Sequence, residues 1–225
     1  MSSDAESLAA AGPCTGSAGG RQPLARRVIK AVLGPYARVW HGLQLEGCEN
    51  LPPRGPALIL LNHASLLEVP MLMVVDPYPD TVTLTKASLF KLPIVRFALR
   101  QWGAIPVDRQ GRDTVGIRLL LRHLRAGRVV AVAAEGRRTR TGHLGPINPV
   151  LARIATGASV LLVPVGVVGS FEALPPGRLL PRRHKILVRV GPCFQLPRDI
   201  DAETAAGRIR QEIAALLPPS QQPLD

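Results

Sequence analysis

The chain has 225 residues, of which 46% are hydrophobic and 20% charged, a composition that excludes a wholly disordered chain. Lysine and arginine outnumber aspartate and glutamate by 28 to 16, and the resulting charge of +12 implies an anionic partner. Aromatic residues make up only 4% and do not alternate with basic residues as in a base-stacking surface, so we expect no nucleic acid partner.

The first 44 residues divide into two segments of different composition. Residues 1–20 are rich in serine, glycine and alanine, and we expect a disordered tail there. Over residues 23–40 apolar side chains recur at helical spacing with cations between them, and Pro35 is expected to kink or split this helix. We assign residues 21–44 to a basic amphipathic segment that contacts an anionic membrane surface. The alternative is a helix packed on the domain with a solvated basic face.

The remainder of the chain alternates between apolar strands and helices. Strands buried on both faces and separated by helices are typical of a single-domain α/β sandwich with a largely parallel central sheet flanked by helices. We expect this domain over residues 45–217, a C-terminal tail over 218–225, and no transmembrane helix, since no run of about 18 apolar residues occurs. The expected strands are 57–61, 81–85, 104–107, 128–134, 159–165 and 185–190, and the expected helices are 66–75, 88–100, 114–126, 149–156 and 202–217.

A histidine and a carboxylate follow the first of these strands. His63 lies just past residues 57–61, at the carboxyl end of a strand, where ligands bind in open α/β sheets. There it can accept a proton from a hydroxyl while Glu68 holds its other ring nitrogen. The alternative is a capping box, in which Ser65 begins the next helix and Glu68 bonds a backbone N–H. Taken alone, this segment favours the capping box.

Cations and a second carboxylate lie at the ends of other predicted strands. With them, the catalytic interpretation of His63 and Glu68 is favoured over the capping box. Lys86 follows the strand 81–85, and Arg109 closes the segment Gly103-Ala104-Ile105-Pro106-Val107-Asp108-Arg109. The segment Glu135-Gly136-Arg137-Arg138 follows the strand 128–134. A carboxylate can orient a hydroxyl, a glycine allows close approach, and an arginine fork binds phosphate. Together the segments predict a base beside an anion-binding surface.

In their order along the chain and in their residues, these segments resemble the motifs of the lysophosphatidic acid acyltransferase family of glycerolipid acyltransferases. The resemblance covers roughly residues 45–195. The family has an aspartate where this chain has Glu68, and a Phe-Pro pair and a threonine where it has Ala133, Ala134 and Arg137. The resemblance implies the following sites: catalytic His63 and Glu68; acceptor-binding Lys86, Arg109, Glu135, Gly136 and Arg138; and an acyl-donor region at Val163 and Pro164.

The resemblance also implies a reaction. His63 acts as general base on the free hydroxyl of lysophosphatidic acid, which attacks the thioester of acyl-CoA or acyl carrier protein directly and gives phosphatidic acid. No metal and no bound cofactor are implied, and we expect a peripheral, monotopic protein on the cytoplasmic face of the cell membrane. Two alternatives stay open. The acceptor can be another lysophospholipid or an acylated amino-acid lipid, or the protein is a membrane-binding pseudoenzyme that lost turnover through Glu68.

Overall fold

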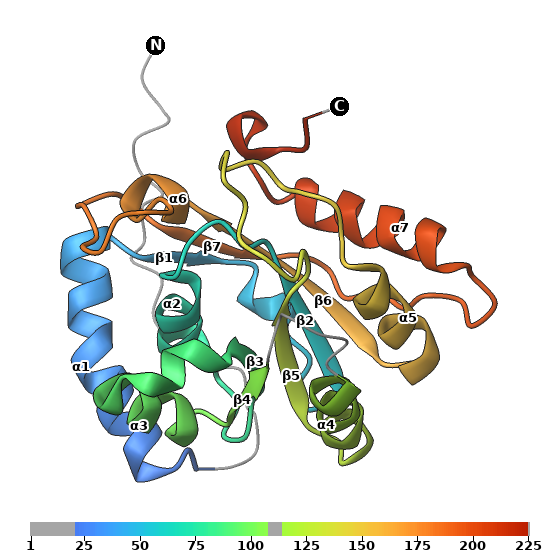
Figure 1. The fold of residues 1–225 in the computed structure, drawn as a ribbon, viewed down its shortest axis with the longest axis horizontal. Coiled ribbons are helices and arrows are strands. Elements are labelled where there is room, and N and C mark those ends of the chain that lie inside the picture. Colours follow the sequence, from blue (N-terminus) through green and yellow to red (C-terminus); the bar gives the residue numbers. More distant parts are fainter. Residues whose placement is uncertain (1–20, 108–113, 225) are drawn as a thin grey trace.

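A seven-stranded sheet forms the centre of the computed structural model, which describes residues 21–107 and 114–224 (Figure 1). The predicted tail over residues 1–20 and Arg109 lie outside the described residues. The strands are ordered β1-β7-β6-β2-β5-β3-β4 across the sheet. Their bounds are β1 Gln44–Glu46, β2 Ala57–Leu61, β3 Val82–Lys86, β4 Ala104–Val107, β5 Val129–Ala133, β6 Leu161–Val168 and β7 Leu187–Val190.

Most of the sheet is parallel, as predicted. Strands β6, β2, β5, β3 and β4 run in one direction, whereas β7 is antiparallel to β6 and β1 is parallel to β7. The central strand β2 is buried along its whole length. Leu58 and Leu60 face one hydrophobic cluster, and Ile59 faces the other. This burial on both faces explains why β2 is continuously apolar rather than alternating.

Helices cover both faces of the sheet and complete a three-layer sandwich (Figure 1). On one face the core is formed with α4, α5 and α7, which contribute Leu120, Ile154 and Ile209. On the other face it is formed with α1, α2 and α3. The helix bounds are α1 Leu24–His41, α2 Glu68–Val75, α3 Pro93–Gln101, α4 Thr114–Arg125, α5 Pro149–Ala158, α6 Ser170–Ala173 and α7 Ala202–Ala214.

Several predicted boundaries differ from the structure. The helix expected over 88–100 is a 3-10 turn at Ala87–Lys91 followed by α3, because Leu92 precedes Pro93 and is extended, as residues before proline prefer. Part of the segment predicted as a C-terminal tail, residues 218–225, contacts the domain. Gln221 is buried, and its carbonyl oxygen accepts a hydrogen bond from the N–H of Leu144 at 2.9 Å.

Helix α1 runs through Pro35 without splitting and directs cations toward the domain. Arg26 is only 4% exposed and donates to the carbonyl oxygens of Gln101 at 3.1 Å and Thr81 at 2.8 Å. The ammonium group of Lys30 donates to the carbonyl oxygen of Asp76. Arg26 and Lys30 are thus directed at the domain, whereas Arg27 and Arg38 are exposed.

The outward side of α1 carries apolar residues instead. Leu24, Val28 and Val32 recur every four residues and are 73%, 53% and 67% exposed. On the neighbouring helix α3, Ile94 is 84% and Phe97 is 60% exposed. Among the described residues, no helix is long and apolar enough to cross a membrane. We refer to Leu24, Val28, Val32, Val39, Ile94 and Phe97 as the apolar surface of α1 and α3.

Candidate active site

Three of the predicted site residues lie at the carboxyl edge of the sheet. His63 follows β2, Glu135 follows β5, and Lys86 is the last residue of β3. Because β5 lies between β2 and β3, the ends of β2 and β3 are about 10 Å apart at normal strand spacing. The sheet therefore brings together three segments that are separated in the sequence.

His63 and Glu68 form a buried pair. Nδ1 of His63 is 2.7 Å from Oε2 of Glu68, and the carboxylate is completely buried while the histidine is 7% exposed. A carboxylate accepts hydrogen bonds, so this contact selects the tautomer in which Nδ1 carries the proton. The lone pair is then on Nε2, where the ring can accept a proton from a substrate.

Glu68 also bonds the backbone at the start of α2. Its Oε1 accepts hydrogen bonds from the N–H groups of Ala64 at 2.8 Å and Ser65 at 2.6 Å. The hydroxyl of Ser170 donates to the same oxygen at 2.8 Å. The two interpretations of Glu68 are therefore compatible: one oxygen bonds the backbone of the turn, and the other bonds the histidine ring.

Glu135 supports the histidine from the backbone side. Oε1 accepts from the N–H of His63 at 2.8 Å, and Oε2 accepts from the N–H of Gly145 at 3.1 Å. Burial raises the pKa of Glu135 to about 6, against the effect of these two hydrogen bonds. Both oxygens are thus directed at backbone N–H groups, and the carboxylate joins the turn at His63 to the loop after β5.

Three further residues that were not among the predicted sites hold this turn. The Asn62 side chain accepts from the N–H of Val167 at 2.7 Å and donates to its carbonyl oxygen at 3.1 Å. The N–H of Thr139 donates to the His63 carbonyl oxygen at 2.8 Å. Ser170, which bonds Glu68, is 102 positions away from it in the sequence. No local pattern around Ser170 indicates this contact.

Two of the predicted acceptor cations, Lys86 and Arg138, lie at the solvent-exposed rim of the site. Lys86 is exposed and Arg138 is half-buried. Gly136 adopts a φ of 73°, and a Cβ there would lie 2.7 Å from Nδ2 of Asn148, so the turn requires glycine. This turn carries the chain from Glu135 at the histidine to Arg138 at the rim.

The predicted acyl-donor residues lie deeper. Val163 and Pro164 are buried in β6, in register with Ile59 and Leu60 of β2. They lie within the sheet below the level of His63, rather than at the carboxyl edge. Among the described residues, no group of three histidine, cysteine or acidic side chains is arranged to hold a metal ion.

These observations define an α/β domain that holds a carboxylate-oriented histidine at the carboxyl edge of its sheet, beside cations. A match to the family model described as Acyltransferase covers residues 42–168, more than half of the chain. The chain therefore belongs to the acyltransferase family.

Individual relatives agree with this assignment. The chain is 28% identical over 141 residues to the 1-acyl-sn-glycerol-3-phosphate acyltransferase LPAT1 of Arabidopsis thaliana chloroplasts, and the match covers 61% of this chain and 39% of that protein. A 1-acyl-sn-glycerol-3-phosphate acyltransferase of Borreliella burgdorferi is 29% identical over 121 residues, 52% of this chain and 48% of that protein. The chain thus spans less than half the length of these relatives.

A solved structure has the same fold. The crystal structure of PlsC, a 1-acyl-sn-glycerophosphate acyltransferase from Thermotoga maritima, superposes with a TM-score of 0.72 at 20% identity. The superposition covers 85% of this chain and 78% of that chain. This similarity confirms the predicted architecture of a largely parallel sheet flanked by helices.

Proposed function

We propose that this protein transfers a fatty acyl group from an acyl thioester to the free hydroxyl of lysophosphatidic acid, giving phosphatidic acid. The observation that carries the proposal is the buried pair of His63 and Glu68, with Nδ1 bonded to the carboxylate at 2.7 Å. A histidine oriented in this way is suited to general base catalysis. The family membership supports acyl transfer, and the names of the relatives support the choice of acceptor.

In the proposed reaction the acceptor hydroxyl gives its proton to Nε2 of His63. The oxygen attacks the thioester carbonyl carbon, and the carbon–sulfur bond breaks as the new ester forms. The leaving thiolate takes the proton back from the imidazolium. Glu68 stabilises that imidazolium because its carboxylate faces Nδ1, and its own position is fixed by the hydrogen bonds to Oε1.

The acceptor phosphate is held by cations at the rim. Lys86 at the end of β3 and Arg138 after the Gly136 turn contribute, and Arg109 is assigned to the same role by its motif. The lateral distance of about 10 Å between the strand ends carrying His63 and Lys86 suits an acceptor whose phosphate and hydroxyl occupy different parts of the site. Glu135 acts as a positioning residue for His63 through its backbone bonds.

The acyl donor is acyl-CoA or acyl carrier protein, and the acceptor is taken from a membrane surface. The apolar surface of α1 and α3 supports the membrane as the source of the acceptor, since exposed apolar patches mark interaction sites. Arg27 and Arg38 on α1 and Arg96 on α3 are exposed and carry the charge that favours an anionic bilayer. We propose a monotopic attachment to the cytoplasmic face of the cell membrane.

A different lysophospholipid or an acylated amino-acid lipid is the second candidate acceptor. Arg137 is exposed in place of the family's threonine, and it adds a charge beside Arg138 at the acceptor rim. This extra charge makes the anion-binding rim differ from that of the family, and this difference is the observation that supports another acceptor.

Thiol release from palmitoyl-CoA, measured with and without lysophosphatidic acid, tests the proposed function. The wild type is expected to release thiol only with the acceptor present, and His63→Ala is expected to lose at least 100-fold in rate. Release that survives in His63→Ala would contradict the proposed mechanism. Release that requires another lysolipid would replace the acceptor and keep the reaction. No release with any acceptor, from a protein that still binds anionic vesicles, would favour the pseudoenzyme.

A further inference from the structure

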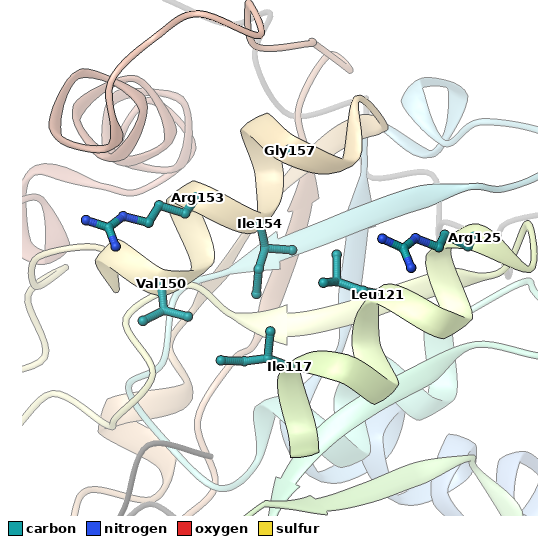
Figure 2. A pocket seen from close by; sticks show the side chains of 7 residues that line it. All are labelled: Ile117, Leu121, Arg125, Val150, Arg153, Ile154 and Gly157. Carbon is teal, nitrogen blue, oxygen red and sulfur yellow. The ribbon is translucent and has the colours of Figure 1, made fainter. Parts of the chain in front are cut away.

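A groove runs between α4 and α5 on the face of the sheet opposite the apolar surface of α1 and α3. Its volume is about 360 Å³. Ile117 and Leu121 of α4 point toward Val150 and Ile154 of α5 across the gap (Figure 2). These residues recur every four positions on each helix, so each helix presents an apolar stripe to the other. The two stripes form an apolar floor that remains open to solvent.

Cations flank this floor. Arg125 and Arg153 line the groove, and Arg118 and Arg122 are exposed on the adjacent side of α4. Neither α4 nor α5 contains an aspartate or a glutamate. The groove is therefore complementary to an acidic partner with an exposed apolar side chain. A second copy of this chain that presents the same groove is disfavoured by like charge.

The placement of the groove favours a partner from solution over a lipid surface. The sheet lies between α4 and α5 on one side and α1 and α3 on the other (Figure 1). A bilayer that contacts the apolar surface of α1 and α3 therefore leaves the α4–α5 groove facing away from it.

The groove also leads toward the catalytic edge of the sheet. Asn148 caps α5 through a 2.9 Å hydrogen bond from the N–H of Val150, and its own N–H donates to the Ala134 carbonyl oxygen at 2.9 Å. Ala134 directly precedes Glu135, which bonds His63. One end of the groove is thus attached to the segment that supports the histidine. A partner seated in the groove therefore contacts α5, whose first turn is bonded to this edge of the sheet.

We propose that the α4–α5 groove docks an acidic helical protein that carries the acyl thioester, and is thus the docking site for acyl carrier protein as donor. This inference rests on the proposed function, because it names the donor of that reaction. An apolar side chain of the carrier occupies the floor formed by Ile117, Leu121 and Ile154. Carboxylates beside that side chain pair with Arg125 and Arg153. The charges mainly speed association and set its salt dependence, while the apolar contact slows dissociation.

Two types of variant test the groove, each with a matched control. Gly157 lines the groove and has open space where a Cβ would be, as does Gly207 on α7 outside the groove. Gly157→Trp fills the groove, and Gly207→Trp adds the same side chain elsewhere. Arg125→Glu with Arg153→Glu reverses the groove charges. Arg178→Glu with Arg208→Glu makes an equal change at exposed residues outside it. Circular dichroism is used to check that every variant is folded.

Binding is measured first, independently of turnover. Fluorescence anisotropy with labelled holo-acyl carrier protein is expected to show binding that weakens with salt. Gly157→Trp and the groove charge reversal are expected to weaken it at least tenfold, and the two control variants less than twofold. Equal effects of groove and control variants, or no binding by the wild type, would overturn the inference. Groove variants that instead weaken binding to anionic vesicles would assign the groove to lipid and also overturn it.

Turnover then separates this inference from the proposed function. The groove variants are expected to lower kcat/KM for palmitoyl-acyl carrier protein at least tenfold and to leave kcat/KM for palmitoyl-CoA unchanged. Equal losses with both donors would contradict a carrier-docking role. If the wild type transfers from neither donor, the proposed function fails, while the binding measurement still decides whether the carrier docks in the groove.

Discussion

The turn around His63 and the apolar surface of α1 and α3 both reverse the usual distribution of residues, in opposite senses. At the turn, Glu68 is completely buried and Glu135 is 9% exposed. On α1 and α3, large apolar side chains such as Ile94 are exposed. Soluble proteins seldom bury carboxylates unless they are bonded, and single exposed apolar residues are common whereas contiguous ones mark interaction sites.

The two regions differ in what their own chain supplies. All four oxygens of Glu68 and Glu135 accept hydrogen bonds from this chain, so the turn is organised before any substrate arrives. Among the residues that the structure describes, none covers the apolar surface, which is left exposed for contact with another surface. Changes at the turn should therefore act on turnover, and changes on the apolar surface on attachment.

The largest effect is expected from Glu68→Gln. The glutamine oxygen can keep the hydrogen bonds to the backbone of the turn, while its NH2 group faces Nδ1 of His63 and selects the wrong tautomer. A comparable change in a Ser-His-Asp triad lowers kcat about 10,000-fold, and we expect a loss of roughly 100- to 10,000-fold here. Steady-state kinetics measure the loss, and an unchanged unfolding midpoint is the control. A rate within threefold of the wild type would contradict the role of Glu68.

Glu68→Asp distinguishes an active enzyme, in which Glu68 orients His63, from a pseudoenzyme that lost turnover through Glu68. The glutamate reaches the backbone N–H groups with one oxygen and the ring with the other, and the side chain of aspartate is one methylene shorter. We expect it to lose one set of contacts and to lower kcat about tenfold or more, which corresponds to a loss of about 1.4 kcal/mol of transition-state stabilisation. A large increase in kcat, by contrast, would indicate that the glutamate at position 68 limits turnover, as expected for the pseudoenzyme.

Glu135→Gln tests whether the backbone bonds at the turn contribute to turnover. Glutamine keeps one acceptor but places an NH2 group opposite either the His63 or the Gly145 N–H. A buried donor left unbonded costs about 1–3 kcal/mol, and we expect a comparable loss of stability and about a tenfold lower kcat. Because Glu135 positions His63, KM for the acceptor should change less than twofold. A rise in KM with constant kcat would instead assign Glu135 to acceptor binding.

The apolar surface is tested by Ile94→Asp combined with Phe97→Asp. Both residues are exposed, so the domain should remain as stable as the wild type. Binding to anionic vesicles, measured by co-sedimentation, should weaken at least tenfold because two apolar side chains no longer enter the interface. Turnover of a short-chain acceptor in solution should be unchanged. Vesicle binding equal to that of the wild type would show that Ile94 and Phe97 do not contribute to membrane attachment.

The sequence predicted those parts of the molecule that depend on short-range pattern. The parallel strands follow from continuous apolar runs such as Ala57–Leu61. The contact between His63 and Glu68 was predicted only with the help of the other segments and the family resemblance, since the spacing alone favoured the capping box. Ser170 could not be predicted as a partner of Glu68, because the contact depends on how β6 returns to the sheet. The roles of Arg109 and the tail over 1–20 remain predictions, since these residues lie outside the described chain.

The orientation of α1 shows a second limit of pattern alone. Apolar side chains and cations both recur at helical spacing along this helix, so periodicity does not decide which set faces the domain. In the structure the side of α1 that carries Arg26 faces the domain. The guanidinium of Arg26 donates to the carbonyl oxygens of Tyr78 and Thr81 and lies 4.9 Å from the centre of the Trp102 ring. Those acceptors come from loops distant in sequence.

The smallest change is expected at Asp76, a buried carboxylate that, unlike Glu68 and Glu135, has one oxygen without a hydrogen bond. Its Oδ1 accepts from the Tyr78 N–H and the Thr81 hydroxyl, each at 3.0 Å, whereas its Oδ2 is buried without a hydrogen bond. Burial raises the pKa of Asp76 from 3.8 to about 6, although Lys30 and Arg26 act to lower it. The folded state therefore binds this proton more tightly than the unfolded chain.

It follows that this carboxyl makes the protein less stable as the pH rises from about 4 to about 6, and has no further effect above that range. The pKa difference corresponds to a loss on the order of 3 kcal/mol. Asp76→Asn keeps the acceptor and removes the charge, so its gain in stability over the wild type should grow across this pH range while turnover is unchanged. Urea unfolding at pH 4.5 and pH 7 measures the difference. A constant difference would mean that Asp76 titrates normally and that Lys30 and Arg26 compensate its burial in full.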